Sequence, residues 1–153
     1  MIEKLDIKNI EVAQSVVDLQ RNSYKVEAKL MDFYEIPPLK ESIDRLQSCD
    51  EIFYGYLIKG TLTGIISFKI IDNVLDIHRL AVDPRNFIMG IASKLINYVE
   101  ELYKDKDVSK ILVSTGKRNI PAINLYLKNG YVNINDVEIA KDVYISKFEK
   151  KYK

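Results

Sequence analysis

The sequence predicts an α/β fold in which helices pack against a mixed β-sheet. Three observations support this prediction. Helical periodicity covers residues 10–33, strands with tight turns cover residues 52–82, and helices alternate with strands over residues 90–148. The chain has 153 residues, of which 47% are hydrophobic and 29% charged. This balance suits a folded chain of one core, so we expect a single domain over residues 1–153.

The N-terminal third is expected to hold a short strand and then helices. Residues 5–7 alternate apolar and charged side chains, as in a half-buried strand. Asn9 can cap a following helix. One side of that helix carries Ile10, Ala13, Val16, Val17 and Gln20. Residues 24–33 predict a second helical stretch, which Pro37-Pro38 ends before a further helix to Leu46.

The middle of the chain predicts an antiparallel meander. Strands over residues 52–58 and 62–71 flank the turn Lys59-Gly60-Thr61, which indicates a hairpin. Asp72-Asn73 forms the next turn and leads into a third strand over residues 74–82. Three consecutive strands joined by tight turns are typical of a meander.

The C-terminal half returns to helical periodicity. A helix is expected over residues 90–103, with an apolar face made of Ile91, Leu95, Tyr98, Val99 and Leu102. A dense apolar strand at 111–115 follows, and then a helix at 119–129. Strands at 131–138 and 143–148 end the chain, and with them the predicted sheet is mixed.

Charge and cysteine content exclude several classes of function. The net charge of +1 predicts neither nucleic-acid binding nor adhesion to an acidic membrane. Cys49 is the single cysteine, so no intrachain disulfide can form and a cytoplasmic location is the simplest expectation. The first residues carry charges where a signal peptide needs an apolar core. His78 is the single histidine and cannot build a His/Cys metal cluster with Cys49, so we expect no metal.

The most informative segment is a strand that passes through a loop into a helix, over residues 80–95. Pro84 stops strand pairing, and the helix is expected to open near Gly90. Gly90, Ala92 and Ser93 are small enough for another group to approach the backbone. The unpaired N–H groups of a helix N-terminus can bind a phosphate. Tight packing of the helix on the sheet is the alternative explanation for these small residues.

Two motifs together resemble the GNAT superfamily of N-acetyltransferases. The first is Val-x-Pro at residues 82–84, followed by the family's (Gln/Arg)-x-x-Gly-x-(Gly/Ala), which is Phe87-Ile88-Met89-Gly90-Ile91-Ala92 here. The second is Asn-x-x-Ala-x-x-Leu-Tyr-x-x-x-Gly-(Phe/Tyr), matched by Asn119, Ala122, Leu125, Tyr126, Gly130 and Tyr131. The order of elements also matches along nearly the whole chain. Phe87 departs from the family's Gln/Arg, so phosphate binding would depend mainly on backbone N–H groups.

The resemblance implies a GNAT-like acyl-CoA N-acyltransferase fold. Its sheet is mostly antiparallel with a central parallel pair, its helices lie on both faces, and it splits between residues 74–82 and 109–115. Acetyl-CoA is then the co-substrate, and its acetyl group passes to a primary amine that attacks directly. A backbone N–H near Leu80 would stabilise the oxyanion. Arg85 or Lys94 would assist at the phosphates.

The same resemblance implies a set of coenzyme contacts. These contacts are Leu80, Ala81, Val82, Phe87, Ile88, Met89, Gly90, Ile91, Ala92, Ser93, Asn119, Ala122 and Tyr126. Asn119 is expected to bind the pantetheine amides, and a plain helix N-cap is its alternative role.

Catalytic roles follow from the chemistry of an amine and a leaving thiolate. An alkyl amine has a pKa near ~10 and must lose a proton, while the thiolate needs a donor. The family match makes Tyr126 the donor, and packing of its helix on the sheet is the alternative role. Regular alternation would place Asp76, His78, Leu80 and Val82 on one face of their strand. His78 is then a candidate base, directly or with Asp76 acting through water, and a structural histidine is the alternative.

Other functions stay open at this point. A catalytically silent acyl-CoA-binding sensor or interaction module would also fit, as would transfer of a longer acyl chain. The acceptor could be a small-molecule or a protein amine, in a pocket walled by Tyr24, Phe33 and Tyr34. The family often dimerises, and exposed strand edges would allow a homodimer.

Overall fold

The computed structural model describes residues 1–152, with the side chain of Ile88 outside the described part. In chain order its elements are β1 (Ile2–Leu5), α1 (Ile10–Met31), the 3-10 helix η1 (Pro37–Leu39), α2 (Ile43–Ser48), β2 (Ile52–Ile58), β3 (Thr61–Ile71), β4 (Val74–Val82), the 3-10 helix η2 (Pro84–Met89), α3 (Ile91–Tyr103), β5 (Lys110–Gly116), α4 (Ile120–Lys128), β6 (Val132–Ala140) and β7 (Val143–Lys151).

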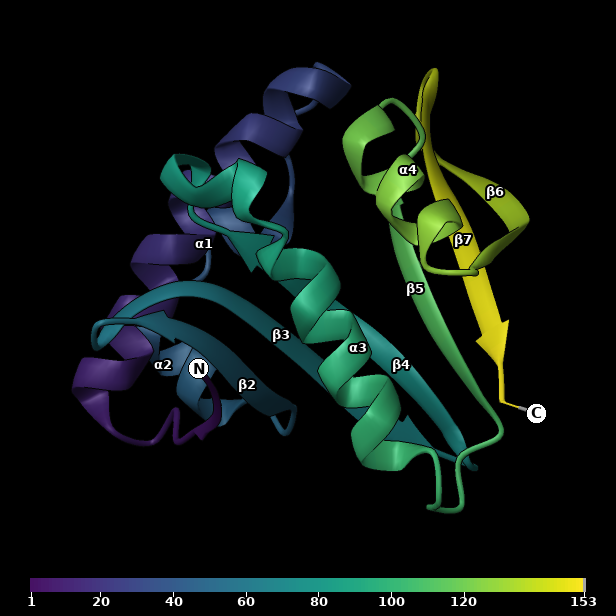
Figure 1. Ribbon diagram of the computed structural model, residues 1–153. Helices are drawn as coiled ribbons and strands as arrows, with labels where there is room; N and C mark the ends of the chain where they lie inside the picture. Colours follow the sequence, from purple (N-terminus) through teal and green to yellow (C-terminus); the bar gives the residue numbers. More distant parts are fainter. Residues whose placement is uncertain (153) are drawn as a thin grey trace.

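The strands form one seven-stranded sheet in the order β1-β2-β3-β4-β5-β7-β6. Neighbouring strands run antiparallel except β4 and β5, which are parallel. The parallel register extends only over Val74–Asp76 against Lys110–Leu112. Beyond Asp76 the two strands diverge, as their upper parts in Figure 1 show. The predicted mixed sheet, and its split at the parallel pair, are therefore confirmed.

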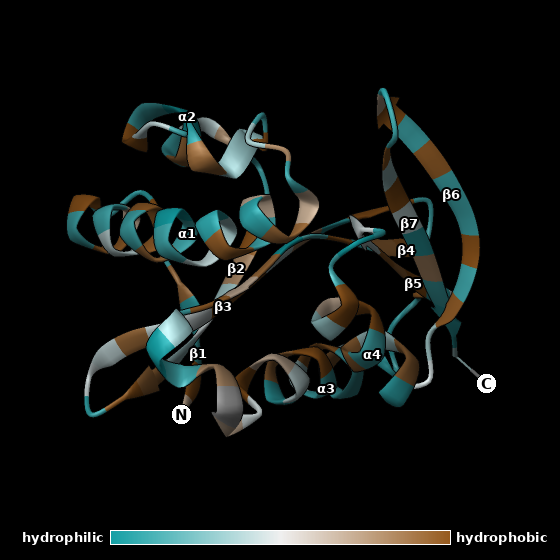
Figure 2. Ribbon diagram, turned by 90° about the horizontal axis from the view of Figure 1, so that it is seen from above, coloured by the Kyte–Doolittle hydropathy of each residue, from teal (hydrophilic) through white to brown (hydrophobic). Residues whose placement is uncertain are grey.

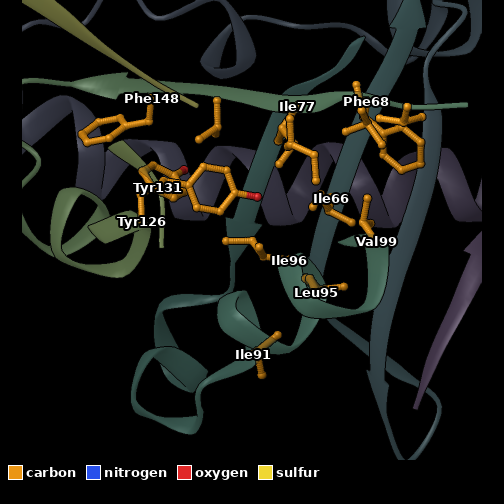
Figure 3. Close-up of a cluster of buried hydrophobic side chains, with 14 of the residues drawn as sticks. Ile66, Phe68, Ile77, Ile91, Leu95, Ile96, Val99, Tyr126, Tyr131 and Phe148 are labelled. Atoms are coloured by element: carbon orange, nitrogen blue, oxygen red, sulfur yellow. The ribbon is translucent and has the colours of Figure 1, made fainter. Parts of the chain in front are cut away.

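Helices cover both faces of the sheet. Helices α1 and α2 lie on one face, and α3 and α4 lie on the other (Figure 2). Each face has its own hydrophobic cluster. The cluster beneath α3 includes Ile66, Phe68, Ile77, Leu95, Ile96, Val99, Tyr126, Tyr131 and Phe148 (Figure 3). The cluster beneath α1 includes Ala13, Val16, Val17, Leu46, Phe53, Ile65 and Ala81.

Helix α1 is longer than expected. A single helix runs from Ile10 to Met31, where the sequence predicted a break before residue 24. The capping prediction is confirmed, since Asn9 Oδ1 accepts hydrogen bonds from the backbone N–H groups of Glu11 (2.9 Å) and Val12 (3.2 Å). No Pro or Gly interrupts residues 20–24, and buried side chains continue across them, so the helix persists. The Pro37-Pro38 pair forms only the short η1, and α2 begins separately at Ile43.

A β-bulge interrupts the alternation of β4. Ser67 pairs with Arg79 while the next residue of β3, Phe68, pairs with Ile77, so His78 is the extra residue. Consequently Asp76 and His78 lie on the α1 face, whereas Leu80 and Val82 pack with the cluster beneath α3. The prediction that these four residues share one face is therefore wrong.

Candidate functional site

A cleft of about 450 Å³ runs from the beginning of α3 to the split in the sheet. Because β4 and β5 diverge there, side chains from helices on opposite faces meet in it. Its walls come from α1, β4, η2, α3 and α4. They include Tyr24, Val26, Glu27, Leu30, Leu80, Val82, Phe87, Gly90, Ala92, Ser93, Asn119, Ala122, Leu125 and Tyr126. We call this the α3 cleft.

The N-terminus of α3 opens into the α3 cleft. Gly90 precedes the helix with a φ of 70°, and no side chain caps the helix there. The first intrahelical bond is donated by the N–H of Lys94 to the carbonyl of Gly90, at 3.1 Å. The small residues Ala92 and Ser93 line the cleft beside this end. An open helix N-terminus with this geometry can bind an anionic group through its free N–H groups and dipole.

Most of the predicted coenzyme contacts line the α3 cleft: Leu80, Val82, Phe87, Gly90, Ala92, Ser93, Asn119, Ala122 and Tyr126. The side chains of Ala81 and Ile91 are buried in the two hydrophobic clusters, and neither lines the cleft. Met89 is exposed and also lies outside the lining, and the side chain of Ile88 is not among the described residues.

Neither cation expected to assist at the phosphates points freely into the cleft. The guanidinium of Arg85 pairs with the carboxylate of Asp83 at 2.8 Å. The ammonium of Lys94 lies over the ring of Tyr56, 5.5 Å from its centroid. An anion at this end would therefore have to be held mainly by backbone N–H groups.

A second cavity of about 210 Å³ adjoins the α3 cleft between the diverging strands. We call it the β4–β5 cavity. The two spaces share a wall made of Tyr24, Glu27, Leu80, Asn119, Ala122 and Tyr126. The β4–β5 cavity continues past Ile36, Pro38, Ile77, His78, Arg79, Val113, Ser114, Thr115 and Ile145. Phe33 and Tyr34, expected to wall an acceptor pocket with Tyr24, line neither space.

The arrangement has clear counterparts among known proteins. The family model described as "Acetyltransferase (GNAT) family" matches residues 14–131. The chain belongs to the GNAT acetyltransferase family. The fold and the family implied by the two motifs are therefore confirmed.

Two curated relatives and one solved structure are similar to the chain. The UPF0157 protein YqkA of Bacillus subtilis is 34% identical over 97% of this chain, which spans only 43% of that relative's length. The spermidine N(1)-acetyltransferase of Thermoplasma acidophilum is 26% identical over 97% of both chains. The crystal structure of the PaiA N-acetyltransferase from Thermoplasma acidophilum in complex with coenzyme A superimposes with a TM-score of 0.81. It is 25% identical, with 99% of this chain and 98% of that one covered.

Tyr126 of this GNAT chain lies on the wall shared by both spaces. Its ring packs against Tyr131 and Phe148, with ring centroids 6.0 and 5.5 Å apart. Figure 3 shows these three side chains within the cluster beneath α3. Burial raises the pKa of its hydroxyl, and nearby Tyr24 and Glu27 add to the effect. The hydroxyl therefore keeps its proton and can act as a hydrogen-bond donor. Tyr126 therefore both packs the helix against the sheet and lines the site.

The N–H of Leu80 points to the same wall. It donates to the hydroxyl of Tyr24 at 3.4 Å, a long hydrogen bond. Burial also raises the pKa of Tyr24, so this hydroxyl is neutral. Tyr24 thus occupies the donor that the sequence assigned to an oxyanion.

His78 lines the β4–β5 cavity, but both of its ring nitrogens face carboxylates. Nδ1 lies 3.6 Å from Glu51 Oε2, and Nε2 lies 3.5 Å from Asp76 Oδ2. Asp76 itself lines neither space. Partial burial raises the pKa of the Asp76 carboxyl, although the neighbouring His78 opposes this.

Sequence reasoning missed Glu27, which lies on the shared wall. Among the described residues it is the one carboxylate that lines either space. The helical spacing of polar residues in α1 could have indicated this position. Gln20, Tyr24 and Glu27 recur at intervals of four and three along the buried stripe of α1, where apolar residues would suffice.

Other chemistries find less support in residues 1–152. No group of three or more His, Cys, Asp or Glu side chains within this range is arranged to hold a metal ion. No helix of this range is long and apolar enough to cross a membrane. Cys49 ends α2, lines neither space, and has a pKa raised by burial.

Proposed function

We propose that the chain is an N-acetyltransferase that transfers the acetyl group of acetyl-CoA to a primary amine by direct attack. The observation that carries this proposal is the continuity of the site. The open N-terminus of α3 lies at one end of the α3 cleft, and the wall shared with the β4–β5 cavity lies at the other. One space suits a long donor with an anionic end, and the other suits a small acceptor.

The residues present fit a CoA thioester. The N–H groups at the beginning of α3 would hold the diphosphate, as the helix dipole favours negative charge there. Leu80, Val82, Ala122 and Leu125 give the cleft an apolar lining suited to an extended pantetheine arm. Asn119 is committed as the N-cap of α4, since Oδ1 accepts from the N–H of Ala122 at 3.3 Å and Nδ2 donates to Thr115 Oγ1 at 3.3 Å.

The transfer itself takes place at the shared wall. The N–H of Leu80 would donate to the thioester oxygen in place of the Tyr24 hydroxyl, and would stabilise the negative charge that develops there. The amine nitrogen attacks the carbonyl carbon and the carbon–sulfur bond breaks. Tyr126 would donate its proton to the leaving sulfur and recover one from the new amide nitrogen. A proton acceptor for the incoming ammonium must line the β4–β5 cavity, where His78 and Glu27 are candidates.

One relative supports an alkyl amine as the acceptor. The relative from Thermoplasma acidophilum that matches 97% of this chain is named as acting on spermidine, an alkyl polyamine. The β4–β5 cavity, at about 210 Å³, has room for one end of such a chain. A free alkyl amine and a lysine side chain present the same reacting group to this cavity, so both belong in the acceptor assay.

The donor site is tested by placing an anion where the diphosphate is proposed to bind. We expect Gly90→Glu to weaken CoA binding by at least about 10-fold, a loss of about 1.4 kcal/mol. Gly90→Ala is the matched control, because it imposes the same strain at φ 70° without charge, and a Cβ at Gly90 meets no atom within 4 Å. Isothermal titration with CoA compares the two. Equal affinities for both variants would remove the diphosphate from this helix end.

Transfer is tested by supplying acetyl-CoA and a panel of alkyl amines to the intact chain. Release of free CoA thiol that depends on the amine, with an acetylated product of matching mass, is the expected result. CoA binding without transfer to any amine, including a peptide N-terminus and a lysine side chain, would favour the silent acyl-CoA-binding module instead.

Single-domain organisation and a cytoplasmic location stay predictions from sequence.

A further inference from the structure

Glu27 is placed where an incoming amine must pass. It projects from the penultimate turn of α1 and lines both the α3 cleft and the β4–β5 cavity. Among the described residues, the two spaces contain no other carboxylate. An alkyl amine arrives mainly as an ammonium ion, since its pKa is near ~10. Glu27 is thus the described carboxylate on these walls that an ammonium group entering either space could face.

The carboxylate of Glu27 is held in position from the opposite side of the split. Its Oε1 accepts from Thr115 Oγ1 at 3.3 Å and lies 3.5 Å from the N–H of Gly116. Helix α1 approaches the end of β5 closely here, since a Cβ added at Gly116 would meet the side chain of Met31. A side chain at Gly116 would require the flexible end of Met31 to move, and the Gly116 N–H faces the Glu27 carboxylate.

No described cation is paired with Glu27. The charged and titratable groups around it are Tyr24 on the same helix, Tyr126 on α4, and His78 and Arg79 on β4. Arg79 is bound by Glu41 and Glu51, and His78 faces Asp76 and Glu51. Burial raises the pKa of the Glu27 carboxyl, although Gly116 and Thr115 oppose this with hydrogen bonds. A carboxylate made more basic in this way is better matched to accept a proton from an amine.

We infer that Glu27 is the group that binds the acceptor's ammonium and takes its proton before attack. This inference rests on the proposed acetyl transfer and names its general base. The proton moves from the ammonium nitrogen to a Glu27 oxygen, which leaves a neutral amine and a carboxylic acid. The nitrogen lone pair then forms the bond to the carbonyl carbon as the sulfur leaves. Glu27 returns its proton to solvent, and the acceptor class is a cationic alkyl amine.

The test compares Glu27→Gln with the wild type on two small acceptors. n-Butylamine is charged at pH 7, whereas acetic hydrazide has a similar size and is neutral. We expect kcat/KM for n-butylamine to fall by about 100-fold or more, as for loss of a general base. Acetic hydrazide needs no proton removed before attack, so its kcat/KM should change far less. The amide introduced by Glu27→Gln can still accept from Thr115 and Gly116, so folding and CoA affinity should be retained.

The pH profile provides a readout that a purely structural role would not change. The wild type should show a rise in kcat/KM as Glu27 ionises and a fall near the pKa of the amine. The Glu27→Gln profile should instead climb up to that pKa, because only the fraction of free amine reacts. A variant profile of unchanged shape, or an equal loss on both acceptors, would overturn the role of Glu27.

Two further variants separate the role of Glu27 from that of other ionisable side chains. Glu11→Gln removes an exposed carboxylate from the same helix and should leave both acceptors unaffected. His78→Gln should have a smaller effect on n-butylamine than Glu27→Gln, and the reverse order would assign the base to His78 instead. If the wild type itself acetylates no amine, the proposed function fails together with the inference. An active wild type matched by Glu27→Gln overturns the inference alone.

Discussion

In the proposed transfer, Tyr126 would both pack in the core and donate a proton to the leaving sulfur. Its ring is part of the cluster beneath α3 and packs against Tyr131 and Phe148, which fixes its direction. Its hydroxyl side reaches the wall shared by the two spaces. Because the packing holds the ring, the hydroxyl loses little conformational entropy when it donates to a leaving sulfur.

We expect Tyr126→Phe to lower kcat by roughly 100-fold, as for loss of a general acid, with much less effect on CoA affinity. Steady-state kinetics with titration of CoA separates the two quantities. Tyr131→Phe is the control, because its hydroxyl donates to Glu100 Oε2 at 2.8 Å and lines neither space. Normal turnover in Tyr126→Phe would remove this hydroxyl from the reaction.

Glu27 should also carry a cost in stability. Burial raises its folded-state pKa above the usual 4.5, so the folded state binds the proton more tightly than the unfolded state. Stability therefore falls as pH rises from about 4.5 through the folded pKa. We expect Glu27→Gln to melt at a higher temperature than the wild type at about pH 8. The difference should shrink towards zero as pH falls to about 4.5. Thermal melts across this range check it, and a pH-independent difference would contradict it.

At the scale of elements, the bulge in β4 is fixed by an ion-pair network. The extra residue turns Arg79 onto the α1 face, where its guanidinium binds Glu51 at 2.9 Å and Gln20 at 2.8 Å and also pairs with Glu41. Burial disfavours the charge, yet the two carboxylates raise the pKa of Arg79. Strand β4 is thereby tied to α1, to the segment before α2 and to Glu51, the residue that precedes β2.

Arg79→Met tests how much the pairing of Arg79 with the two carboxylates contributes to stability. The Glu41 and Glu51 carboxylates, with side chains 14% and 9% exposed, would be left in the interior without their cation. We expect a loss of about 3–5 kcal/mol in the free energy of unfolding, measured by urea denaturation. Arg85→Met is the matched control, because its side chain is 82% exposed and its pair with Asp83 should contribute at most about 1 kcal/mol. Equal losses would contradict this account.

The elements that sequence located well are those specified by local patterns. The cap at Asn9, the meander at residues 52–82 and the open start of α3 all depend on neighbouring residues and were predicted. The bulge was not, because the partners of Arg79 lie 28 to 59 residues away and the pattern of β4 alone suits regular alternation. The missed role of Glu27 has the same origin, since its importance depends on β5 lying opposite α1.

At the scale of the whole molecule, the sheet consists of two parts that meet along a short parallel seam. Strands β1 to β4 form one part, and β5, β7 and β6 form the other. Figure 1 shows the strands of the two parts spreading from their common end. The seam holds the parts together, and its short length leaves the opposite ends free to frame the two spaces.

In the proposed reaction, the wall common to both spaces would make donor and acceptor share one volume. A donor with a longer acyl tail would extend beyond Leu80 into the β4–β5 cavity, which measures about 210 Å³. Each additional methylene on the tail would then take away room from the amine. We therefore expect the largest amine that is acetylated to become smaller as the acyl tail becomes longer. The bulkiest amines should react only with the shortest acyl donors.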